Sequence, residues 1–117
     1  MIKRRKSKPF GIRQNTRIRS PAHLKWVRGH ECAVKDKSDY YCYGKAQAAH
    51  VRTGTDGALS IKPSDCYVIP LCCHHHGIQH TLGEASFERE YQINMKKIAA
   101  DLWKISPARI KMERNSG

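Results

Sequence analysis

The feature that most constrains this chain is a run of metal-ligating side chains, in which two cysteines and four histidines occupy positions 72 to 80. If a helix begins near Cys72, that residue and His75 are three positions apart and share one face of the helix. His76 and His80 are four positions apart and share a second face, rotated by about 100° from the first. The spacing therefore predicts one helix that serves two metal sites.

The first predicted site is a structural zinc held by Cys32, Cys42, Cys72 and His75. A closed tetrahedral zinc site needs four thiolate or imidazole ligands and has no open position. Two of the ligands come from an irregular N-terminal segment and two from the helix, so zinc would clamp distant segments together and supply folding free energy to a small core. Nine residues separate Cys32 from Cys42, whereas the cysteines of a zinc knuckle usually have about two to four between them.

Other interpretations of the cysteines remain open. A different ligand set would use Cys66 or Cys73, and the thiols could also be free and buried. The odd number of five cysteines argues against a disulfide framework. The sequence has neither a signal peptide nor an apolar run long enough to span a membrane. We therefore expect a cytoplasmic protein with no membrane partner and with metal-binding cysteines.

The second predicted site is catalytic. His76 and His80 form an i, i+4 pair that can place two imidazoles on one divalent ion, whereas the plainer reading is a surface cluster that binds metal opportunistically. His50 lies 26 residues before His76 on a predicted strand, and a hairpin would bring it over the helix. An imidazole suits the role of general base in phosphodiester hydrolysis, although a lone histidine on a strand is more often structural. The histidine pair on the helix favours the catalytic role.

Hydrophobic patterning and turn residues predict an α+β fold with one domain over residues 21–107. Ser20 and Pro21 form an N-cap and a first-turn proline for a short helix. We expect the second strand to weaken towards its end at Pro70, and the helix that carries the histidines to end at Gly83. The other expected elements are strands over 45–51 and 66–71, a loop over 53–65, and helices over 72–81, 84–91 and 94–105, followed by a polar tail over 108–117.

The charge of the chain is concentrated at its N-terminus. The first 30 residues hold ten Lys or Arg and no acid, whereas the other 87 residues hold twelve basic and ten acidic groups. We therefore predict a disordered basic arm over residues 1–20 that binds a polyanion; the alternative is a solubilising tail or a segment ordered only in an assembly. The predicted nucleic-acid contacts are Lys3, Arg4, Arg5, Lys6, Lys8, Arg13, Arg17 and Arg19.

Several motifs together resemble an HNH endonuclease. They are QAAHVRTGTDG at 47–57, KPSD at 62–65, VIPLC at 68–72 and the histidines at 75, 76 and 80. The resemblance extends to the phage and prophage branch that includes the recombination-enhancement nuclease, with which Gly83, Glu84, Phe87, Glu88 and Tyr91 also agree. It covers roughly residues 24–107.

This resemblance implies a small ββα-metal fold of treble-clef type with flanking helices. It implies that His50 is the general base, that His76 and His80 bind the catalytic ion (Mg²⁺ or another divalent ion), and that Asp65 braces the loop that carries the base. Many HNH enzymes have Asp, Glu or His just before the base, where this chain has Ala49. Water, Asp56 or another group would then complete the metal shell, or the ion is held weakly.

Three functions are compatible with the sequence. The first is a metal-dependent DNA endonuclease or nickase, encoded by a phage or prophage and linked to recombination or DNA processing, with a recombination or packaging protein as a candidate partner. The second is a non-catalytic, zinc-stabilised module that binds nucleic acid. The third is a component of a phage particle or packaging machine that carries this fold. An accessible His50 in an open cleft favours the first, whereas a coordinated or buried His50 favours the second.

Overall fold

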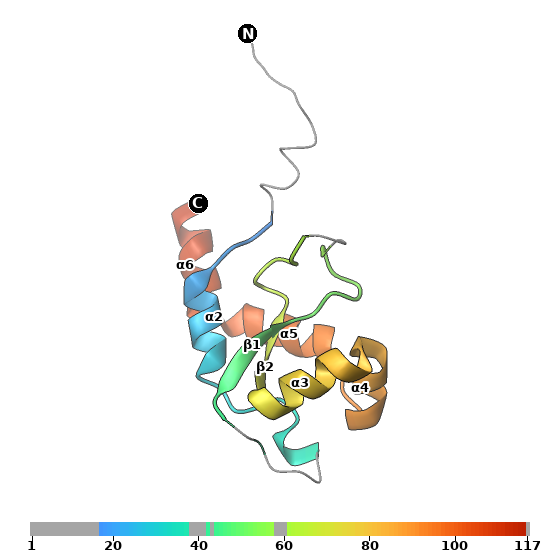
Figure 1. The fold of residues 1–117 in the computed structure, drawn as a ribbon. Coiled ribbons are helices and arrows are strands. Elements are labelled where there is room, and N and C mark those ends of the chain that lie inside the picture. The colour runs from blue at the N-terminus through green and yellow to red at the C-terminus, as the bar shows by residue number, and fades with distance from the viewer. Residues whose placement is uncertain (1–16, 38–41, 43, 58–60, 117) are drawn as a thin grey trace.

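The computed structural model of the chain describes residues 17–37, 42, 44–57 and 61–116, and within them the fold is α+β, as predicted (Figure 1). Among these residues, a two-stranded antiparallel sheet is surrounded by five α-helices and one short 3₁₀ helix. The elements, in chain order, are α2 (Pro21–Arg28), η2 (Lys35–Lys37), β1 (Ala46–His50), β2 (Val68–Cys72), α3 (Cys73–Leu82), α4 (Glu84–Tyr91), α5 (Met95–Ile105) and α6 (Pro107–Ser116).

The hairpin of β1 and β2 carries the centre of the fold, and its register runs from Ala46 opposite Cys72 to His50 opposite Val68. The second strand continues through Pro70 to Cys72, so the expected weakening at Pro70 is wrong. The Pro70 carbonyl accepts from the N–H of Ala33 at 2.8 Å. Because the N–H and C=O of one residue point to the same side of an antiparallel strand, the missing donor of Pro70 lies away from β1 and removes no bond between the strands.

Helices α3, α4 and α5 lie within one residue of the bounds expected from the sequence, and α2 begins at Pro21 as expected. The Ser20 side chain caps α2 by accepting from the N–H of His23, and the Asn94 side chain caps α5 in the same way. Gly83 ends α3 with a φ of 88°, a left-handed conformation that favours glycine. The Cys72 thiol occupies the N-cap of α3 and accepts from the N–H of His75, which ties the end of the hairpin to the start of the helix.

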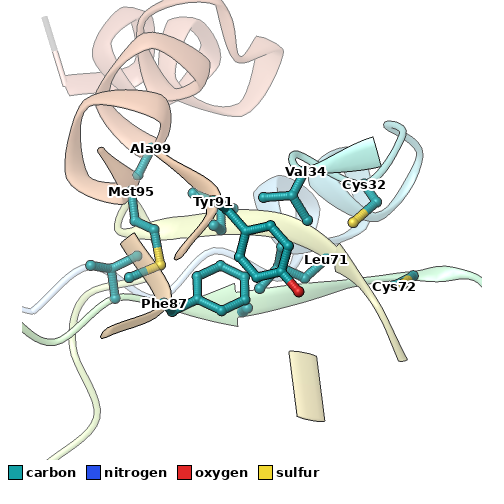
Figure 2. Close-up of a cluster of buried hydrophobic side chains, with 11 residues drawn as sticks. Cys32, Val34, Leu71, Cys72, Phe87, Tyr91, Met95 and Ala99 are labelled. Atoms are coloured by element: carbon teal, nitrogen blue, oxygen red, sulfur yellow. The ribbon is translucent and has the colours of Figure 1, made fainter. Parts of the chain in front are cut away.

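The hydrophobic core lies between the sheet and helices α4 and α5 (Figure 2). Every residue of β2 is buried, because this strand contacts α2, α3 and α5 as well as β1. Phe87 and Tyr91 project from α4, and Met95 and Ala99 from α5, into one cluster with Leu71. Tyr91 also packs edge-on against the His75 ring, with centroids 5.5 Å apart, so the core and the cysteine-rich end of the hairpin form one continuous unit.

Two segments differ from the sequence-based expectation. Residues 108–117 were expected to be a polar tail, but residues 107–116 form α6, which packs against α2 and α5. The last residues of the predicted arm, 17–20, lie against Asp56 and residues 62–65: the Asp65 N–H donates to the Ile18 carbonyl and the Ile18 N–H to the Ser64 hydroxyl. Residues 1–16 lie outside the described part of the chain. None of the described helices is long and apolar enough to cross a membrane.

Candidate metal centre and histidine cleft

The four predicted zinc ligands converge at the junction of β2 and α3. The Nδ1 atom of His75 lies 3.1 Å from the Cys72 thiol, 3.5 Å from that of Cys32 and 3.8 Å from that of Cys42. All four ligand atoms lie within 4.8 Å of one another. Cys32 follows α2, Cys42 precedes β1, and the other two ligands belong to the start of α3. The cluster therefore joins three separate segments.

These distances fit one tetrahedral ion. With Zn–S near 2.3 Å and Zn–N near 2.0–2.1 Å, tetrahedral angles place a sulfur about 3.6 Å from the nitrogen. The observed separations lie on both sides of this value. Burial, together with the hydrogen bonds and charges of Cys32 and Cys72, raises the pKa of Cys42 to about 12, so this thiol would resist ionisation unless a cation compensated its charge. The cluster is compatible with a structural zinc site.

The alternative ligand sets are not assembled. Cys66 is buried near the carboxyls of Asp56 and Asp65, and burial raises the pKa of its thiol to about 11. Cys73 is exposed. Neither belongs to the cluster, which consists of the three cysteines and one histidine that the sequence analysis favoured.

The second face of α3 carries His76 and His80, as expected. Their Nε2 atoms lie 3.2 Å apart. Two imidazoles on one tetrahedral ion at the usual bond length would place these atoms about 3.3 Å apart. Burial lowers the pKa of His76, and the charges of His80 and His50 lower it further. The pair is therefore spaced to share one ion, and the lowered pKa of His76 favours the neutral form of that ring, which binds metal.

His50 lies at the end of β1 and pairs with Asp65, whose Oδ1 atom is 3.0 Å from the His50 Nε2 atom. The His50 side chain is 18% exposed, so it is neither sealed in the core nor part of the cysteine cluster. An ionised carboxylate can only accept, so the proton of the neutral imidazole lies on Nε2 and the lone pair on Nδ1. This arrangement leaves Nδ1 able to take a proton.

Asp65 is itself held from several sides. Its Oδ2 atom accepts from the N–H of Ser20 at 2.8 Å, and Arg19 lies 3.5 Å from Oδ1. Burial alone would raise the pKa of Asp65, but the hydrogen bonds from Ser20 and His50 and the charges of His50 and Arg19 outweigh it and lower the pKa. Asp65 is therefore a buried, ionised group in direct contact with His50, a more specific placement than the loop brace that the resemblance implied.

An open cleft of about 570 Å³ unites these histidines. His50 projects from the hairpin and His76 and His80 from α3, so a substrate in the cleft would meet all three side chains. Arg52 and Lys62 add positive charge to the wall, which favours an anionic substrate. The full lining is Ala48, His50, Arg52, Thr53, Lys62, Pro63, His76, Gln79, His80, Gly83, Glu84 and Ala85.

Two residues considered for the metal shell have other surroundings. Ala49 is fully buried in the hydrophobic core, on the strand face opposite to that of His50. The Asp56 carboxylate accepts from the N–H and the hydroxyl of Ser64, which fixes the loop instead of facing the histidine pair. Within the described part of the chain, His76 and His80 join no cluster of three or more metal-binding side chains.

Sequence reasoning assigned no role to Glu84 or Gln47. The two Glu84 carboxylate oxygens accept from the N–H groups of Arg52 and Thr53, each at 2.7 Å, and so link the start of α4 to the chain just after His50. The Gln47 side-chain oxygen lies 2.6 Å from His76 Nδ1. In the sequence, Glu84 was noted only as part of the family resemblance. Gln47 is a single polar residue on a short strand, and nothing in the sequence signals its contact with His76, 29 positions away.

The two described arginines of the predicted arm make contacts within the protein. Arg17 donates to the Asp56 carbonyl, and Arg19 donates to the carbonyls of Lys62 and Pro63. These bonds anchor the base of the arm beside the cleft. Contact of the two arginines with nucleic acid stays a prediction; the other six predicted contacts lie outside the described residues.

In a comparison with protein families, the family described as "Protein of unknown function (DUF968)" matches residues 9–105. Comparisons with curated proteins and with solved structures give no match. The matched range holds all four residues of the cysteine and histidine cluster and all three histidines of the cleft. Since the match spans well over half of the 117 residues, the chain belongs to the DUF968 family.

Proposed function

We propose that this protein is a metal-dependent HNH endonuclease or nickase that hydrolyses DNA phosphodiester bonds. The observation that carries the proposal is the cleft that joins His50, backed by Asp65, to the pair of His76 and His80. In this reading the β1–β2 hairpin and α3 are a ββα-metal unit of treble-clef type, and the cysteine cluster holds its structural zinc. A phage or prophage origin and a role in recombination or DNA processing belong to the same proposal.

His50 would act as the general base. Asp65 holds the proton on Nε2, so Nδ1 can accept a proton from the water that attacks phosphorus. The same carboxylate then stabilises the imidazolium that forms, because an opposite charge in direct contact favours the protonated ring. His50 needs no ligand role for this chemistry, in keeping with its place outside the cysteine cluster.

His76 and His80 would hold the catalytic ion through their Nε2 atoms. A divalent ion bound there would stabilise negative charge on a phosphate oxygen and on the leaving oxygen. With two imidazoles from the chain, positions remain for water and for phosphate oxygens, and Ala49 offers no further ligand. Arg52 and Lys62 on the wall of the cleft would attract the phosphodiester backbone without reading its sequence.

The second candidate is a non-catalytic module that binds nucleic acid. One observation favours it: among the described residues, no third metal-binding side chain joins His76 and His80. A module of this kind would keep the structural zinc and the basic arm but would not depend on an ion in the cleft. The difference between the candidates is therefore metal-dependent strand cleavage.

A nicking assay separates the two candidates. Purified, zinc-loaded protein should relax supercoiled plasmid when a divalent ion is added. Nicking should stop when a chelator removes the added ion, while the zinc content of the protein stays constant. His80→Ala should lose nicking and regain part of it at high Mn²⁺ or Ni²⁺ concentration. His74→Ala is the matched control and should nick normally, because His74 is an exposed histidine on the same helix that contacts the ring of His75 but is a ligand of neither site. Absence of nicking by the parent protein with every divalent ion would favour the binding module.

A further inference from the structure

We propose that Gln47 is a positioning residue for His76 and fixes the imidazole tautomer whose Nε2 lone pair faces His80. The inference rests on the proposed function, in which these two histidines hold the catalytic ion. In this arrangement Gln47 on β1 prepares His76 on α3 to bind the ion.

The hydrogen bond between the two side chains determines the tautomer. Gln47 Oε1 lies 2.6 Å from His76 Nδ1. An amide oxygen can only accept a hydrogen bond, so Nδ1 must carry the proton of the neutral ring. The other ring nitrogen, Nε2, then has the free lone pair, and this is the atom that lies 3.2 Å from His80 Nε2. A lone pair at Nε2 is what an ion between the two rings requires.

The hairpin register places Gln47 for this contact. Gln47 pairs with Leu71, and Leu71 comes two residues before the start of α3. The glutamine therefore lies beside the first turns of the helix, within reach of His76. Gln47 is exposed and belongs to no part of the hydrophobic core, so the contact with His76 is the interaction that distinguishes this side chain.

Gln47 does not act as a direct ligand in this arrangement, because its oxygen is bonded to Nδ1 and the ion would bind Nε2. It acts as an outer-shell partner. Histidines that bind metals usually donate their other ring N–H to a carboxylate or carbonyl oxygen, which fixes the ring and makes it a better ligand. Loss of such a partner typically weakens metal binding by about 10- to 100-fold.

Two substitutions separate positioning from simple stability. Gln47→Leu removes the acceptor, whereas Gln47→Glu keeps an acceptor and adds charge. Lys45→Leu, at an exposed position just before β1, controls for adding an apolar side chain there. In zinc-loaded protein without added divalent ion, ¹⁵N NMR should report the Nδ1–H tautomer of His76 in the parent, in Gln47→Glu and in Lys45→Leu. Gln47→Leu should lose this preference.

Calorimetric titration of the same zinc-loaded proteins with Co²⁺ gives the second measurement. Gln47→Leu should bind Co²⁺ about 10- to 100-fold more weakly, and Gln47→Glu at least as tightly as the parent. An unchanged tautomer preference or an unchanged Co²⁺ affinity in Gln47→Leu would overturn this inference and leave the proposed function intact. No Co²⁺ binding by the parent protein would instead refute the proposed ion site, and with it the ligand that Gln47 prepares.

Discussion

Replacing Asp65 with asparagine should disable His50 while leaving the domain folded. The two Asp65 oxygens accept from different donors: Oδ2 from the Ser20 N–H and Oδ1 from His50 Nε2. Asparagine has only one acceptor oxygen, and its amide nitrogen can only donate. The Ser20 N–H is a backbone donor that cannot change its role, so we expect the asparagine oxygen to face Ser20 and the amide nitrogen to face His50.

The effect on stability follows from these contacts. Asp65→Asn keeps the bond to Ser20 and weakens the contacts with His50 and Arg19, so the free energy of unfolding should fall by about 1–2 kcal/mol. Asp65→Ala leaves the buried Ser20 N–H without an acceptor and should cost about 2–4 kcal/mol. Both losses lie below the roughly 5–15 kcal/mol by which domains are stable, so Asp65→Asn should be fully folded at 25 °C.

The effect on catalysis should be larger. An amide nitrogen facing His50 Nε2 needs an acceptor there, so the proton moves to Nδ1, and the atom that should take the water proton becomes a donor. The same exchange of carboxylate for amide behind a catalytic histidine lowers kcat by about 10⁴-fold in a serine protease. We expect a loss of about 10²- to 10⁴-fold in nicking rate from Asp65→Asn.

Urea unfolding and single-turnover plasmid nicking, measured on the same preparations, check both parts. Nicking by Asp65→Asn at the parent rate would refute the role of Asp65 in orienting His50. A loss of more than about 4 kcal/mol of stability would show that the substitution acts through folding.

The lowered pKa of Asp65 also predicts how its contribution depends on pH. The folded state binds the proton less readily than the unfolded state, so the stabilisation is present above the usual pKa of about 3.9. It is lost as the pH falls through the lower, folded value. The difference in unfolding free energy between the parent and Asp65→Asn should therefore be largest near neutral pH and shrink below about pH 4.

Three further predictions concern the rest of the molecule. Cys72→Ser should lose the roughly one zinc expected per chain and unfold, because a structural zinc contributes on the order of 10 kcal/mol to folding. Cys73→Ser, at an exposed position, should keep both its zinc and its fold. Elemental analysis and circular dichroism that show Cys72→Ser folded and free of zinc would contradict this prediction. Glu84→Ala frees two exposed N–H groups next to the His50 strand, so the free energy of unfolding should fall by only about 1 kcal/mol. The nicking rate should fall by more than this loss of stability explains. An unchanged nicking rate would remove Glu84 from the site. Deleting residues 1–16 should weaken duplex binding and flatten a log K against log salt slope of about −4 to −5, if about five phosphates are contacted; an unchanged slope would show that the arm is not the anchor.

The sequence predicted the two strands, the histidine helix and the shared face of Cys72 and His75 because each depends on local patterning. A glycine at position 83 signals the end of a helix, and its φ of 88° is a conformation that favours glycine. Cys72 and His75 are three positions apart, so they lie on the same face of the helix wherever it begins near Cys72. The choice of Cys42 over Cys66 and Cys73 could not follow from spacing alone. It depends on the path of the chain before β1, which brings Cys42 to His75 across 33 positions.

The parts that sequence reasoning missed depend on long-range contacts. Helix α6 has no clear apolar stripe, so its sequence resembles a polar tail; it is packed against α2 and α5 in the fold. The residues at 17–20 looked like part of a charged arm, yet their backbone bonds to residues 64 and 65 across 45 or more positions. The contacts of Gln47 and Glu84 depend in the same way on the hairpin register and on the turn at Gly83.

The most direct test of the account is the single-turnover rate of plasmid nicking by His50→Ala. This substitution removes the proposed base but touches neither the zinc cluster nor the pair of His76 and His80. We expect His50→Ala to have normal zinc content and DNA affinity, a rate lowered by about 10²- to 10⁴-fold, and no rescue by added Mn²⁺ or Ni²⁺, with His74→Ala nicking at the parent rate. Cleavage by His50→Ala as fast as by the parent protein would contradict the proposed mechanism.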